Sequence, residues 1–106
     1  MQNKYTVQIY RALNKKEPFV EWLNSINDKR VLAKITRRIR RLEFGQFGDY
    51  KFLGEKLYEL RFFVGPGYRV YYTVQGKRVI LIIGAGDKKT QLKDIKNARK
   101  IIKRIK

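Results

Sequence analysis

Two arginines stand inside the stretch ELRFFVGPGYRVYY, residues 59–72, whose pattern predicts two β-strands joined by a Gly-Pro-Gly turn. Because side chains alternate across a strand, Arg61 and Arg69 should share one face of this hairpin with Glu59 and Tyr71. Guanidinium groups bind phosphate through paired hydrogen bonds, and an aromatic ring can stack on an unpaired base. The combination is typical of a site for a nucleic-acid phosphate. The alternative is that Arg61 pairs with Glu59 or another carboxylate and solvates an exposed strand.

A second polar group, GAGDKKTQ at residues 84–91, follows the most apolar predicted strand and precedes the last predicted helix. Backbone amides at a helix start attract anions, so Lys88 and Lys89 are candidate phosphate-binding residues. The simpler interpretation is that the glycines only permit the turn and that Asp87 or Thr90 caps the helix. The spacing G-x-x-x-x-G-K-[ST] of a Walker loop is absent.

The composition narrows the available chemistry. The chain has no histidine and no cysteine, which excludes imidazole acid–base pairs, thiol nucleophiles and His or Cys metal sites. Its nine acidic residues show no metal-ligand spacing, so we expect neither a metal nor a cofactor. Attack of a ribose 2′-hydroxyl on its own phosphate needs alignment and charge neutralisation rather than a metal. Arg61, Arg69 and Lys88 are the cations predicted to supply that charge.

The charge balance points to a polyanionic partner. The chain of 106 residues carries 26 Lys and Arg against 9 Asp and Glu, a formal net charge of +17. Such a charge repels further copies and attracts nucleic acid or an acidic protein. The length fits a single domain, residues 1–106. Neither a signal peptide nor a membrane-spanning stretch is recognisable, so we expect a cytoplasmic protein without a membrane partner.

The elements that must position these residues follow from apolar periodicity. A half-buried strand is expected in residues 4–13 and a helix in 17–26, and a second, strongly basic helix should end near Gly45. A glycine-rich, turn-like stretch follows, and then come three strands and a terminal helix, at about residues 57–64, 68–74, 79–85 and from 90 onward. The third of these strands is apolar on both faces and should lie inside the sheet. The order β-α-α-β-β-β-α predicts an α+β domain with the first two helices on one sheet face and the other face partly open.

Three segments together resemble a known family: EPFVEWLNSINDKRVLAKITRRIRRLEFGQFGD, LYELRFFVGPGYRVYY and GAGDKKTQLKDIKNA. In this order they resemble RelE/ParE-superfamily toxins of type II toxin–antitoxin modules, closest to the HigB-like branch of addiction-module killer proteins. The resemblance implies a RelE-like fold with a small, mostly antiparallel sheet. It also implies ribosome-dependent mRNA cleavage through 2′-hydroxyl attack, and neutralisation by an antitoxin of the helix-turn-helix type in a hetero-oligomer.

The resemblance also assigns roles to residues. Arg61 corresponds to an arginine that acts on the scissile phosphate, and Lys88 lies near a second catalytic cation. Lys51 and Lys56 fall where such toxins place lysines beside the cleaved message. The tyrosine that some members carry near the C-terminus has no counterpart in QLKDIKNARKII.

Two other functions remain open at this stage. A ParE-like toxin of the same fold would poison DNA gyrase without nuclease activity, and a basic RNA-binding module would cleave nothing. Arg61 and the DKK cluster at residues 87–89 favour the ribonuclease, because a gyrase poison needs no cations gathered around one phosphate.

Overall fold

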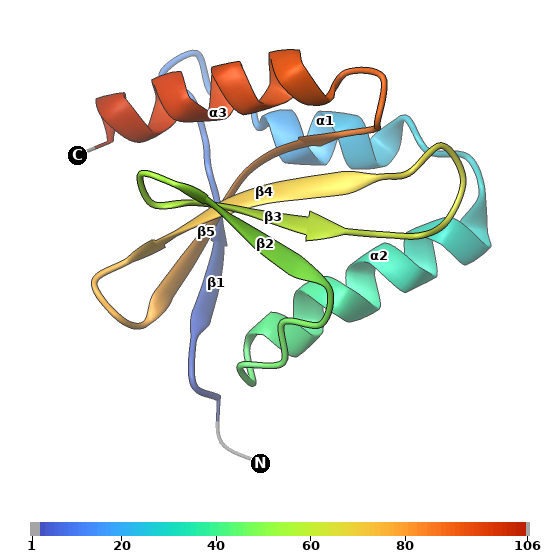
Figure 1. Ribbon diagram of the computed structural model, residues 1–106, viewed down its shortest axis with the longest axis horizontal. Helices are drawn as coiled ribbons and strands as arrows, with labels where there is room; N and C mark the ends of the chain where they lie inside the picture. The colour runs from blue at the N-terminus through green and yellow to red at the C-terminus, as the bar shows by residue number, and fades with distance from the viewer. Residues whose placement is uncertain (1–2, 106) are drawn as a thin grey trace.

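The computed structural model describes residues 3–105, and in them one five-stranded sheet is combined with three helices (Figure 1). The elements in chain order are β1 (Thr6–Ile9), α1 (Pro18–Asn24), α2 (Lys29–Leu42), β2 (Tyr50–Gly54), β3 (Leu57–Arg61), β4 (Arg69–Gln75), β5 (Val79–Gly86) and α3 (Gln91–Arg104). The mixed α+β class predicted from the sequence is confirmed. The predicted element order is not matched, because it lacked β2. None of these helices combines the length and apolar character that crossing a membrane requires.

The strands lie in the order β1-β5-β4-β3-β2. Strand β1 pairs in parallel with β5, and every other pair is antiparallel. Strand β5 therefore has a neighbour on each side, as its apolar residues on both faces predicted. Strand β2 forms one edge of the sheet.

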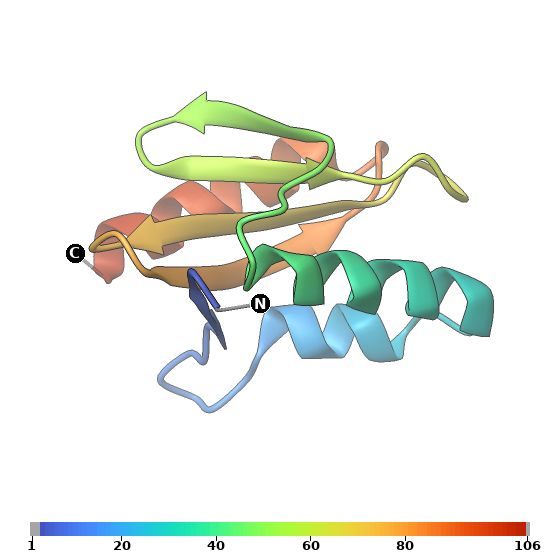
Figure 2. The ribbon, with the colours of Figure 1, turned by 90° about the horizontal axis from the view of Figure 1, so that it is seen from below.

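Helices α1 and α2 cover one face of the sheet (Figure 2). Pro18 stands at the start of α1, where a missing backbone N–H has no consequence, and the Asp28 carboxylate caps α2 by accepting from the amides of Arg30 and Val31. Their buried side chains join those of the strands in one cluster, which contains Phe19, Ile26, Ile35, Leu42, Leu60, Phe62, Val70, Tyr72, Ile80 and Ile82.

Strand β2 lies within the stretch that we predicted to be a glycine-rich turn. It pairs antiparallel with β3, so that Tyr50 faces Leu60 and Phe52 faces Tyr58. Gly48 lies two residues before the strand and Gly54 is its last residue, and both have positive φ. The glycines therefore mark the turns at the ends of a short strand.

Helix α3 covers the second sheet face, which we expected to be partly open (Figure 1). Ala98 and Ile102 from the helix pack with Tyr71 and Ile83 from the strands. The contact is closest at Gly86, where a β-carbon would overlap the Asp94 carboxylate in the first turn of α3. Helix α3 therefore covers part of the sheet face that carries Arg61 and Arg69.

Candidate phosphate-binding site

The three predicted catalytic cations gather at one end of the sheet. Arg61 and Arg69 are direct partners in the register of β3 and β4, and Arg69 is in turn paired with Gly86 on β5. Lys88 follows two residues later. A β-carbon on Gly67, in the β3–β4 turn, would stand 3.3 Å from Arg69 Nη1 and 3.6 Å from the Lys88 β-carbon. Residues far apart in the sequence thus meet where the hairpin turn touches the β5–α3 connection.

Arg69 is held in place by the protein itself. Its Nη1 donates to the Gly67 carbonyl at 2.7 Å, and its Nε lies 3.6 Å from a Glu59 carboxylate oxygen. The Glu59 side chain is 2% exposed and also accepts a hydrogen bond of 3.0 Å from Gln91 at the start of α3. With 16% of its side chain exposed, Arg69 has a fixed position and little freedom to swing toward a ligand.

Arg61 is more accessible. Its Nη2 donates to the Asp49 carboxylate at 3.0 Å, while 39% of the side chain stays exposed. Its backbone amide also donates to the Asp49 carbonyl. The pairing with a carboxylate that the sequence left open therefore exists, but the partner is Asp49 rather than Glu59.

Arg38 supports this corner from α2, the helix that the sequence predicted to be strongly basic. Its guanidinium donates to the carbonyls of Arg61, Phe47 and Asp49 and lies 4.6 Å from the centre of the Phe62 ring. Burial lowers the pKa of Arg38, and the nearby Asp49 charge partly opposes that shift. Arg38 therefore fixes the backbone beside Arg61 and is not a ligand-binding residue.

The local charges follow from these contacts. Each arginine of the pair has its own carboxylate, Glu59 for Arg69 and Asp49 for Arg61, so the pair is balanced before any ligand arrives. The cationic surface presented to a ligand comes from the exposed part of Arg61 and from Lys88, which is exposed.

Tyr71 does not have the role that we predicted. It is completely buried beneath α3, so it offers no face on which an unpaired base could stack. Burial raises its pKa strongly, and the neighbouring Glu59 carboxylate raises it further. The prediction from strand alternation placed Tyr71 on the correct face, but the last helix closes that face.

The backbone amides of residues 88–90, which lie just before α3, are paired within the protein. Asp87 accepts hydrogen bonds from the amides of Lys89 and Thr90, at 2.8 and 3.1 Å. The Lys88 amide donates to the Pro66 carbonyl. Asp87 therefore organises this turn, whereas the side chain of Thr90, at the N-cap of α3, makes no capping hydrogen bond to the helix amides. The exposed side chains of Lys88 and Lys89 remain available at this corner.

The two other predicted RNA-binding lysines lie on the hairpin that β2 and β3 form. Lys51 is exposed on β2 and faces Glu59 on β3. These two residues lie two positions along the chain from Asp49 and Arg61, respectively. Lys56 stands in the β2–β3 turn with φ +69°, at the far end of β3 from Arg61. Lys51 can flank the arginine pair, whereas Lys56 belongs to a different part of the surface.

Comparison with known proteins identifies the family. Residues 21–106 match the family described as "Phage derived protein Gp49-like (DUF891)". The chain belongs to this Gp49-like family. A protein of Haemophilus influenzae, itself described as uncharacterized, is 44% identical over 94 residues, which cover 89% of this chain and 91% of that protein. The function of this Gp49-like protein must therefore be argued from its own residues.

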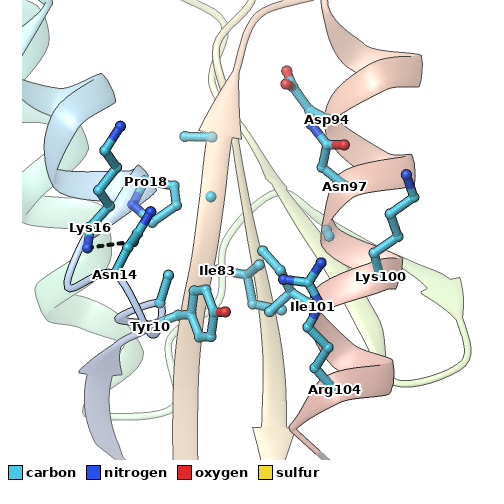
Figure 3. A pocket seen from close by; sticks show the side chains of 14 residues that line it. Tyr10, Asn14, Lys16, Pro18, Ile83, Asp94, Asn97, Lys100, Ile101 and Arg104 are labelled. Atoms are coloured by element: carbon cyan, nitrogen blue, oxygen red, sulfur yellow. Dashed lines mark hydrogen bonds between the residues drawn. The ribbon is translucent and has the colours of Figure 1, made fainter.

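A groove separates α3 from the segment between β1 and α1 in this Gp49-like protein (Figure 3). Its volume is about 360 Å³, and Ile83, Gly84 and Ala98 are among its lining residues. Lys16 stands on one wall and Lys100 on the other. This groove could not be predicted from the sequence, because its two walls lie more than seventy residues apart in the chain. Its lining residues Gly84 and Ala85 directly precede Gly86, the β5 partner of Arg69.

Proposed function

We propose that this Gp49-like protein is the toxin of a type II toxin–antitoxin module and acts as a ribosome-dependent mRNA endoribonuclease. The observation that carries the proposal is the direct pairing of Arg61 with Arg69 on adjacent strands, with Lys88 at the same corner. The resemblance to RelE/ParE toxins supports it, since Arg61 falls at the position of a catalytic arginine there and Lys88 falls near a second catalytic cation. The cognate antitoxin, the ribosome and mRNA are the proposed partners.

In the proposed reaction the message supplies its own nucleophile. The ribose 2′-hydroxyl attacks the adjacent phosphorus, the bond from oxygen 2′ to phosphorus forms, and the bond from phosphorus to the 5′-oxygen breaks. The products are a 2′,3′-cyclic phosphate and a 5′-hydroxyl. Arg61 and Lys88 neutralise the charge that grows on the phosphate oxygens, and Arg69 sets the position of the corner. The 2′-hydroxyl loses its proton and the leaving 5′-oxygen gains one. The chain does not supply all the groups for this proton transfer, which is consistent with dependence on the ribosome.

The test is cleavage of a message during cell-free translation. Purified protein should cut the translated message at defined positions, and Arg61→Gln should lower the cleavage rate about 100-fold, as for loss of one transition-state cation. Arg40→Gln is the matched control, because it removes the same charge from an exposed position on α2. Equal rates for the two variants would contradict the proposed role of Arg61.

One observation favours a second candidate, a ParE-like poison of DNA gyrase. Both arginines are already paired with carboxylates, which a protein without nuclease activity would tolerate better than a nuclease would. Incubation of the protein with gyrase and supercoiled DNA separates the two functions. Stalled gyrase–DNA complexes without message cleavage would establish the second candidate and exclude the first.

A further inference from the structure

A cluster of aromatic rings lies on the sheet face opposite the arginines. Its six members come from the segment before β1, the loop before β2 and the strands β2, β3 and β4: Tyr5, Phe47, Tyr50, Phe52, Tyr58 and Tyr72. Tyr72 lies between Tyr58 and Phe47 in a nearly parallel stack, with an angle of 11° in each pair and centroid distances of 5.1 and 6.4 Å. We call these six residues the aromatic cluster.

The aromatic cluster reaches the surface along the edge strand β2. Tyr50 is 47% exposed and Phe52 is 54% exposed, although both pack against other rings of the cluster. A cavity of about 350 Å³ opens among five of its rings, and Val74 and Lys77 complete the lining. Tyr50 is the half-exposed ring that lines this cavity, and Phe52 extends the exposed aromatic surface beside it, which suggests a ligand.

A polar atom at the base of the cluster points to the same conclusion. Tyr72 is 1% exposed, and within residues 3–105 its hydroxyl has no hydrogen-bond partner. Burial raises its pKa, and the hydroxyls of Tyr50 and Tyr58 add to the shift, so the group stays a protonated donor. Buried donors without a partner are rare in folded proteins. Tyr72 also lines the cavity, so this unpaired donor belongs to one of the lining residues.

We propose that the aromatic cluster binds one unpaired nucleobase of a single-stranded nucleic acid, with Lys77 at the adjoining phosphate. A nucleobase is flat, stacks on tyrosine and carries donors and acceptors along its edge, which matches the rings and the buried hydroxyl of Tyr72. The net charge of +17 attracts nucleic acid and opposes packing of this patch against a second copy. The site lies on the other face from Arg61 and is independent of the proposed cleavage.

The experiment compares two labelled oligonucleotides of about eight nucleotides, one with bases and one abasic, by fluorescence anisotropy. Both carry the same phosphates, so their difference in affinity isolates base stacking. The protein should prefer the oligonucleotide with bases about tenfold, near the low end of measured base stacking on aromatic side chains. Tyr50→Ala should abolish the preference, whereas Tyr50→Phe should keep it because the ring remains. Lys77→Ala should weaken both oligonucleotides alike and reduce the salt dependence.

Three results would overturn the proposal. The first is equal affinity of the natural protein for both oligonucleotides, and the second is a base preference that survives in Tyr50→Ala. The third is a dimer in sedimentation that Tyr50→Ala dissociates, which would make the patch an interface between two copies. Circular dichroism of each variant confirms that it is folded. Arg61→Gln should lower the cleavage rate about 100-fold and leave the base preference intact, so that failure of the cleavage proposal and failure of this one remain distinguishable.

Discussion

Replacing Glu59 by glutamine removes one negative charge from beneath Arg69 and leaves the size of the side chain almost unchanged. The charges lie 3.6 Å apart, and the exposed fractions are 16% for Arg69 and 2% for Glu59. At an effective dielectric constant of about 20, Coulomb attraction at this distance is about 5 kcal/mol. Partial rehydration of Arg69 recovers some of this energy. We therefore expect a loss of about 3 kcal/mol in the free energy of unfolding, at the low end for a broken buried pair.

Urea unfolding followed by circular dichroism measures this loss, and Asp49→Asn is the matched control. That substitution removes the same charge from the other arginine, but the Arg61 and Asp49 side chains are 39% and 31% exposed. An exposed pair of this kind contributes under about 1 kcal/mol, so Asp49→Asn should change the midpoint little.

Either of two results for Glu59→Gln and Asp49→Asn would contradict the buried pairing of Arg69 with Glu59. A Glu59→Gln protein that unfolds at the natural midpoint would show that Glu59 does not hold Arg69. Equal losses in the two variants would show that burial does not distinguish the two arginines, and that Arg69 is no more fixed than Arg61.

Three further predictions concern packing and ionisation. Gly86→Ala should lower the free energy of unfolding by about 2 kcal/mol, since its β-carbon overlaps the first turn of α3. In the control Gly84→Ala the β-carbon meets nothing within 4 Å, so its urea midpoint should equal that of the natural protein. Tyr72→Phe should raise the free energy of unfolding by about 1 kcal/mol, because it deletes a buried hydroxyl without a partner, and a lowered urea midpoint would contradict this. Folding raises the pKa of Tyr71 and Tyr72 above the unfolded value, so the free energy of unfolding should be retained below about pH 10 and should fall above it. The tyrosinate absorbance of Tyr71 and Tyr72 should therefore appear only when the protein unfolds. Its appearance in the folded protein would contradict this prediction.

Strand alternation was sufficient to place Arg61, Arg69 and Tyr71 on one face, because alternation is a local property of the chain. It could not say what covers that face. The apolar stripe of α3 shows that the helix packs somewhere, but which sheet face it meets depends on the β5–α3 connection. The fit of Gly86 against Asp94 was likewise invisible in the sequence.

The supporting residues of the candidate site were missed for a related reason. Asp49 reaches Arg61 only because the pairing of β2 with β3 brings them together. The glycines near both ends of β2 made this stretch resemble a turn, so the strand was not predicted. Arg38 lies on a helix rich in arginines, so nothing in the pattern singled out the one that turns inward to three carbonyl groups. The aromatic cluster draws on four separate segments, which only the fold brings together.

The central claim is that a corner built on Arg61, Arg69 and Lys88 promotes attack by the 2′-hydroxyl of the message. The most direct measurement uses two translated messages that differ by a single 2′-deoxy nucleotide at a mapped cleavage position. The all-ribose message should be cut there and leave a 2′,3′-cyclic phosphate, and the deoxy message should stay intact at that position. Cleavage of both messages at the same rate would contradict the claim.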